Sequence, residues 1–89
     1  MNNKIILESL ALDLKRVSMG YHRGSIKMAN RFLEEAIKRK DEADISLLKP
    51  YMRRIIVRVH KLKDDRSRIA EDAQMLSTLV QNYTILNFK

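Results

Sequence analysis

Residues 5–19, IILESLALDLKRVSM, decide how this chain folds. Their apolar side chains recur at helical spacing and form one continuous face, made of Ile6, Leu7, Leu10, Leu14 and Val17. A second, narrower apolar stripe lies on the opposite side, with members seven residues apart: Ile5, Leu12 and Met19. A helix that is apolar on two sides packs against two neighbours. The stretch therefore predicts a helix over residues 3–19 within a helical bundle.

Two further segments have the same helical periodicity. Ser25 can cap a second helix that reaches about Lys40. Its expected core residues are Ile26, Ala29, Phe32, Leu33, Ala36 and Ile37. A third helix is predicted to begin near Ser46, because Pro50 is tolerated in a first helical turn. Its apolar seam is Leu48, Met52, Ile55, Val59 and Leu62.

The fourth predicted helix runs from Arg66 to about Leu86. Asp64 or Asp65 ends the third helix and can cap the fourth. The seam of the fourth helix is Ile69, Ala73, Leu76, Val80 and Tyr83. Four amphipathic helices joined by short loops favour an up-down-up-down arrangement. We therefore expect an all-α, small four-helix up-down bundle in which residues 1–89 form a single helical domain.

The connection between the first two helices leaves one alternative open. Glycine is a common helix stop, so a break is expected around Gly20 and Gly24. Residues 20–24 contain no proline, however, and the first two helices could form one bent rod. With two glycines and one proline in the whole chain, the sequence disfavours an all-β fold, which would need several hairpin turns.

The composition excludes several classes of function. The chain has no cysteine, so it has no disulfide framework, thiolate metal site or cysteine nucleophile. No apolar run exceeds three residues, and neither a membrane span nor a signal peptide is expected. We expect no metal site and no cofactor, because the two histidines lie 38 positions apart without a carboxylate pair nearby. The expected location is the cytoplasm.

Positive charge is concentrated in the middle of the chain. The net charge is +7, and residues 14–33 and 45–63 contain no acidic side chain. A surface rich in cations attracts polyanions, and a 17-residue third helix would run for about 25 Å along a duplex. The candidate nucleic-acid-binding residues are Lys49, Arg53, Arg54, Arg58, Lys61, Arg23 and Lys27. The alternative is a solvated face, or a face paired with acids of a neighbouring helix or subunit.

The third predicted helix also contains an arginine and a histidine close together in the sequence. Arg54 and His60 are six residues apart, as are Arg16 and His22. The stretch from residue 53 to residue 60 resembles the motif of HEPN ribonucleases, which are small four-helix proteins. The resemblance implies that His60 acts as a base while an arginine stabilises the phosphorane. Ile55 stands where that motif has a polar residue, and Arg53, seven residues from His60, shares its helix face.

The last predicted helix lacks charge. Residues 73–88 contain no Asp, Glu, Lys or Arg, although one third of the chain is charged. Charge depletion with retained amides and methionine is typical of the centre of a protein interface. The candidate interface residues are Gln74, Thr78 and Gln81, together with Ile5, Leu12 and Met19. The alternative is a helix that lies at the centre of the bundle, covered by the other three.

These features predict a non-catalytic, basic helical binding module rather than an enzyme. It is expected to be a homodimer that contacts nucleic-acid backbone or an acidic protein partner, without a membrane. One alternative is a HEPN-like ribonuclease or an inactive relative of one. Another is a structural subunit of a larger assembly, in which the basic charge faces an acidic partner chain.

Overall fold

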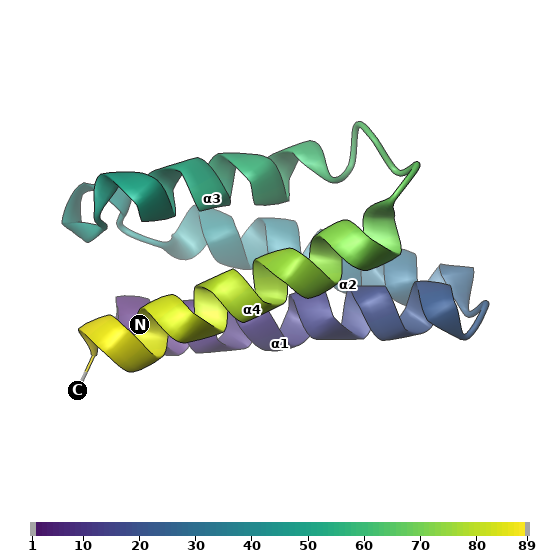
Figure 1. The fold of residues 1–89 in the computed structure, drawn as a ribbon, viewed down its shortest axis with the longest axis horizontal. Coiled ribbons are helices and arrows are strands. Elements are labelled where there is room, and N and C mark those ends of the chain that lie inside the picture. The colour runs from purple at the N-terminus through teal and green to yellow at the C-terminus, as the bar shows by residue number, and fades with distance from the viewer. Residues whose placement is uncertain (1, 89) are drawn as a thin grey trace.

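The computed structural model describes residues 2–88, which form four helices in chain order (Figure 1). They are α1 (Asn3–His22), α2 (Ile26–Glu42), α3 (Pro50–Lys61) and α4 (Ile69–Asn87), with a short 3₁₀ turn, η1 (Ile45–Leu47), before α3. Successive helices run in opposite directions, so the start of α1 and the end of α4 lie at the same end of the bundle. The predicted all-α four-helix architecture is confirmed.

Helix α1 occupies the central place in this bundle. It packs closely along both α2 and α4, whereas α3 has fewer close backbone contacts, which it shares between α2 and α4. In Figure 1, α1 and α4 form the lower layer and α3 lies above them. Both neighbours pack on one broad face of α1, because the small residues Ala11 and Ser18 are buried beside the apolar seam. The narrower stripe of Ile5, Leu12 and Met19 is exposed, so the expectation that it packs against a second helix of the bundle is wrong.

The predicted apolar seams form the hydrophobic core. All five expected core residues of α1 are buried, as are the five of the α3 segment and the five of α4. In α2, Ala29 and Leu33 are buried, but Ile26 is exposed, so its assignment to the core is wrong. Ile26 is the first residue of α2, beside the turn that follows α1. The core also contains Ile56, which widens the seam of α3.

The turn between α1 and α2 differs from the expected break. Helix α1 continues through Gly20 to His22, and the left-handed residue that ends it is Gly24, at φ +75°. Gly20 lies where α1 crosses α2, and a Cβ added there would be 2.7 Å from the Cβ of Ala29. The two helices run in opposite directions, so the single bent rod is wrong.

The third helix begins later than expected. Residues 45–47 form the separate turn η1, and α3 starts at Pro50, whose fixed φ suits a first helical position. Helix α3 therefore has 12 residues and a length of about 18 Å, instead of the expected 25 Å. Among residues 2–88, no helix combines the length and the apolar content needed to cross a membrane.

Both predicted helix caps differ in the structure. Ser25 precedes α2 as expected, but its side chain makes no capping hydrogen bond. Helix α4 begins only at Ile69, so Asp65 is too distant to cap it. The carboxylate of Asp65 instead accepts hydrogen bonds from the backbone N–H and the hydroxyl of Ser67. These hydrogen bonds to its charged form lower the pKa of Asp65 below its usual value.

Candidate functional site

The outer surface of α3 contains a row of three exposed cations, which we call the α3 row: Arg54, Arg58 and Lys61. Their spacing of four and then three residues places them on one side of the helix. The opposite side is the buried seam that fixes the orientation of α3. The three ion pairs within 4 Å among residues 2–88 all lie elsewhere: Arg16–Asp13, Arg39–Glu42 and Lys40–Asp41. The α3 row therefore faces solvent with its charge uncompensated by close pairing.

Acidic side chains approach one half of the α3 row. Arg58 and Lys61 line a groove between α3 and α4 that also contains Asp65 and Asp72. One guanidinium nitrogen of Arg58, Nη2, lies 4.0 Å from the sulfur of Met75 in α4. Arg54 does not line this groove. Arg58 and Lys61 therefore have carboxylates near them, whereas Arg54 is outside the groove that holds these carboxylates.

Arg53 and Lys49, two other predicted binding residues, lie at the start of α3. The Nε–H of Arg53 donates to the carbonyl oxygens of Ile45 and Leu48, both at 3.0 Å. Arg53 therefore ties α3 to the preceding turn η1. The side chain of Lys49 is exposed, while its backbone N–H donates to the hydroxyl of Tyr83 at 3.1 Å.

A second group of cations gathers where α1 meets α2 and where α3 meets α4, because these two connections lie at the same end of the bundle (Figure 1). We call this group the basic end: Arg23, Lys27, Lys63, Arg66 and Arg68, all exposed. Two carboxylates lie among them in the sequence, Asp64 and Asp65. The guanidinium of Arg66 donates to the side-chain oxygen of Asn30 at 2.8 Å, which links the connection between α3 and α4 to helix α2.

Sequence analysis found only part of the basic end. It selected Arg23 and Lys27 but not the three cations of the connection between α3 and α4. The analysis of the sequence did not consider which connections lie at the same end of the bundle. In an up-down bundle the first and third connections lie at the same end, so their charges add even though they are about 40 residues apart.

The histidines do not form the arrangement that the HEPN resemblance implied. His60 is partly buried, and its Nδ1 has no hydrogen-bond partner among the described residues. The guanidinium of Arg53 contacts the carbonyls of residues 45, 46 and 48 instead of His60. His22 is exposed at the end of α1. Within residues 2–88, no three His, Asp or Glu side chains cluster as metal ligands would.

A buried carboxylate, which the sequence analysis missed, lies between α1 and α2. Asp13 is 8% exposed, and its Oδ1 lies 3.8 Å from Nη1 of Arg16. Burial raises the pKa of Asp13, and the nearby charges of Arg39 and Arg16 only partly offset this effect. Arg16 also lies over the ring of Phe32, 5.2 Å from its centroid. Arg16 therefore pairs with Asp13 within α1 and joins α1 to α2 through its contact with Phe32.

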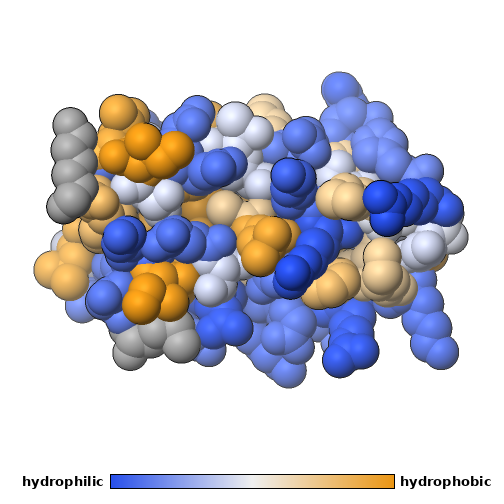
Figure 2. Space-filling model, turned by 90° about the horizontal axis from the view of Figure 1, so that it is seen from below, coloured by the Kyte–Doolittle hydropathy of each residue, from blue (hydrophilic) through white to orange (hydrophobic). Residues whose placement is uncertain are grey.

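The predicted interface residues share one exposed surface, which we call the α1–α4 face. Ile5, Leu12 and Met19 are 48%, 47% and 36% exposed on α1. Gln74, Thr78 and Gln81 are exposed on α4, so the other three helices do not enclose α4. Figure 2 views the bundle from the side of α1 and α4 and shows apolar patches separated by hydrophilic ones, mainly toward the end that holds the chain termini.

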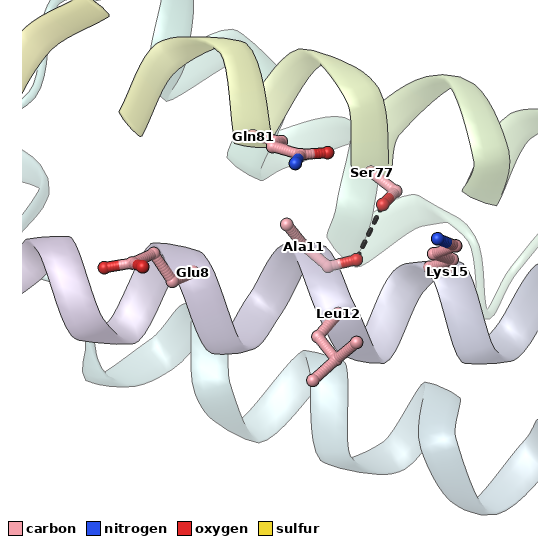
Figure 3. A pocket seen from close by; sticks show the side chains of 6 residues that line it. All are labelled: Glu8, Ala11, Leu12, Lys15, Ser77 and Gln81. Atoms are coloured by element: carbon pink, nitrogen blue, oxygen red, sulfur yellow. Dashed lines mark hydrogen bonds between the residues drawn. The ribbon is translucent and has the colours of Figure 1, made fainter. Parts of the chain in front are cut away.

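The two helices of the α1–α4 face are held together beneath a shallow groove (Figure 3). The hydroxyl of Ser77 donates to the carbonyl oxygen of Ala11 at 2.6 Å. The groove is lined by Glu8, Ala11, Leu12, Lys15, Ser77 and Gln81. Along α1, Glu8 and Lys15 lie on either side of Leu12. The face therefore combines apolar groups, uncharged amides and one charge of each sign.

Comparison of the chain with protein-family models, with curated proteins and with solved structures gives no match.

Proposed function

We propose that the chain is a non-catalytic module that binds the phosphate backbone of duplex nucleic acid. The observation that carries this proposal is the α3 row, in which Arg54, Arg58 and Lys61 are exposed on one side of a helix without an acidic residue. Cations that contact phosphates release the counterions condensed on a duplex, and this release favours binding without regard to sequence. The basic end adjoins the carboxyl end of α3 and extends the row.

The aromatic side chain of α3 supports backbone binding over base stacking. Tyr51 packs edge-on against Tyr83, with 5.5 Å between ring centroids. A base-stacking platform needs free aromatic faces interleaved with cations. Tyr51 is the single Phe, Tyr or Trp residue in α3, so α3 has no series of aromatic faces interleaved with its cations. Phosphate contacts position a protein on nucleic acid but do not read its sequence, so we propose sequence-independent binding.

We propose that the module acts as a homodimer joined through the α1–α4 face. The exposure of Ile5, Leu12 and Met19 supports this proposal, since large apolar groups on a surface favour association. The uncharged residues of α4 beside them can be desolvated at lower cost than charged ones. No described contact favours the HEPN alternative, because Arg53 is engaged with η1.

A charge-reversal experiment tests the binding proposal. Arg54→Glu combined with Lys61→Glu should lower affinity for a duplex by about tenfold or more at 50 mM salt, because two phosphate contacts become repulsive. The wild-type affinity should fall with salt at a log–log slope of about −4 to −5, as expected for about five phosphates. Fluorescence anisotropy with a labelled duplex of mixed sequence measures both quantities.

The control for this experiment is Lys4→Glu combined with Lys38→Glu. These exposed lysines lie on α1 and α2, and the double variant has the same net charge as the α3 variant. We expect its affinity to change much less. An equal loss in both variants would show that net charge alone drives binding. Undetectable or salt-insensitive binding at 50 mM salt would contradict the proposal and favour an acidic protein partner.

A further inference from the structure

The exposed side of α1 contains one line of five residues, which we call the α1 stripe: Ile5, Glu8, Leu12, Lys15 and Met19. They are spaced alternately three and four residues apart, so they follow one another along the same side of the helix. Each of them is exposed, and no other described helix covers the line. Three of the five are large apolar residues, which makes the stripe a candidate for contact with a helix of another chain.

The α1 stripe is almost symmetrical about Leu12. An apolar residue stands seven positions before it and another seven positions after it. A carboxylate, Glu8, precedes Leu12 by four positions, and an ammonium group, Lys15, follows it by three. If a second copy of the helix is placed antiparallel about Leu12, each Ile5 meets a Met19. Each Glu8 then lies within about one residue, or 1.5 Å along the axis, of a Lys15.

The charges of the α1 stripe distinguish between the two possible directions. A parallel pair would place Glu8 against Glu8 and Lys15 against Lys15, which is repulsive. An antiparallel pair places opposite charges together. Its two helix dipoles also point in opposite directions, which is favourable. Arg16 does not compete with Lys15 for this role, because it is directed toward Asp13 and Phe32 on the side of α2.

We infer that a second copy of this chain docks antiparallel on the α1 stripe, with a two-fold axis passing beside Leu12. This inference rests on the homodimer proposed above and adds its symmetry and register. The groove between α1 and α4, which Leu12 lines with Ser77 and Gln81, lies beside the axis and can receive side chains of the partner. The uncharged side chains Gln74, Thr78 and Gln81 border the contact on the side of α4.

Disulfide trapping tests the register directly, since the chain contains no cysteine of its own. Leu12→Cys should cross-link to itself under mild oxidation, because the two copies of residue 12 meet at the axis. Ile5→Cys alone should not cross-link, but a mixture of the Ile5→Cys and Met19→Cys chains should form the mixed dimer. Val57→Cys, which is exposed on α3, is the control for random collision. Non-reducing electrophoresis measures the products.

Charge exchange provides a second test that does not depend on cysteine chemistry. Glu8→Lys and Lys15→Glu should each weaken the dimer by about tenfold. Each substitution replaces two symmetry-related pairs of opposite charge with two pairs of like charge. The double variant restores opposite charges and should recover most of the affinity. Sedimentation of the protein alone, without nucleic acid, measures the dissociation constant.

The outcomes separate the register from the rest of the function. A dimer in which Ile5→Cys cross-links to itself as readily as Leu12→Cys would overturn the antiparallel register and leave self-association intact. A chain that stays monomeric at high concentration would overturn both. Neither result affects binding of the duplex by the α3 row, which is measured separately with Arg54 and Lys61. A stable complex with an acidic helix in place of a second copy would also overturn the inference.

Discussion

Helices α1 and α3 both pack an apolar side against the core, but they have different neighbours. Helix α1 lies between α2 and α4, and only a narrow stripe of it remains exposed. Helix α3 has few close backbone contacts, and a broader part of its circumference faces solvent. Both helices have a regular buried seam, so both contribute to the core. They differ in what remains exposed. In α3 the exposed side chains are mainly cationic, whereas α1 exposes three large apolar side chains, Ile5, Leu12 and Met19, among charged ones of both signs.

This difference shows that the residues left exposed after packing, rather than the composition of the whole helix, decide what a helix offers to a partner. Helix α2 is also rich in charge, but two of its cations form ion pairs within the same helix, Arg39 with Glu42 and Lys40 with Asp41. Helix α3 contains no acid and cannot neutralise its own cations. The stripe of α1 has three large apolar side chains exposed, Ile5, Leu12 and Met19.

The largest predicted effect is the loss of stability on truncation of a buried side chain in the apolar seam of α1 or α3. Leu14 in α1 and Met52 in α3 are both fully buried. We expect Leu14→Ala to lower the free energy of unfolding by about 3–4 kcal/mol and Met52→Ala by about 2 kcal/mol, because the less enclosed site around α3 can collapse around the cavity. Denaturant titration followed by circular dichroism measures both.

Leu12→Ala is the matched control, because Leu12 lies on the exposed side of the same helix. Its effect on the stability of the monomer should stay below about 0.5 kcal/mol. If Leu12→Ala and Leu14→Ala had equal effects at a concentration where the chain is monomeric, the assigned faces of α1 would be wrong. Equal losses for Leu14→Ala and Met52→Ala would instead show that α3 is packed as tightly as α1.

An intermediate effect is expected where α1 crosses α2. Gly20→Ala places a methyl group 2.7 Å from the Cβ of Ala29 and 3.0 Å from its Cα, so the helices must move apart. Alanine has a higher helix propensity than glycine, which offsets part of this cost. We expect the free energy of unfolding to fall by about 1–2 kcal/mol in total, as denaturant titration measures. Adding Ala29→Gly should recover part of the loss. A more stable Gly20→Ala variant would show that the crossing tolerates a wider separation.

The smallest predicted effect concerns the buried acid of α1, which has no counterpart in α3. Burial raises the pKa of Asp13, because the charged carboxylate is less stable when it is removed from water. The charged form therefore destabilises the fold at pH values above this pKa. This destabilisation is lost as the carboxylate becomes protonated at lower pH. Asp13→Asn should therefore raise the melting temperature slightly at pH 7, and the gain should shrink as the pH falls toward about 4.

Thermal unfolding of Asp13→Asn between pH 4 and pH 8 measures this effect. The exposed Glu34→Gln variant in α2 serves as the control and should show no such trend. A lower melting temperature for Asp13→Asn at pH 7 would mean that the contact of Asp13 with Arg16 stabilises the fold more than burial destabilises it.

The apolar seams could be predicted from the sequence because helical periodicity is a local property. The seam of α4 from Ile69 to Tyr83 is buried as expected, and so is that of α1. The caps could not be predicted in the same way. Whether Ser25 or Asp65 meets a helix N–H group depends on the path of the turn, which the whole bundle determines. Pro50 marked the first turn of α3 correctly but not the separate turn η1 before it.

Only part of the candidate site could be predicted from the sequence, because its other features depend on how the helices pack. Exposed cations on a helix without acids, such as Arg54 and Lys61, follow from spacing alone. The role of Arg53 does not, because its acceptors are backbone carbonyls of η1, which a side-chain pattern cannot reveal. The convergence of Lys63 and Arg68 with Arg23 required the order of the helices in space.

The position of α3 has a consequence for what a dimer can do. Helix α3 packs against α2 and α4 and lies on the side of the bundle away from α1 (Figure 1). Two chains joined through α1 therefore direct their α3 rows outward, in opposite directions and separated by the thickness of two bundles. Such a dimer cannot place both rows on neighbouring half-sites of one duplex. If the proposed dimer and the proposed duplex binding both hold, the dimer would instead bridge two nucleic-acid segments, and it would draw separate duplexes together or close a loop within one molecule.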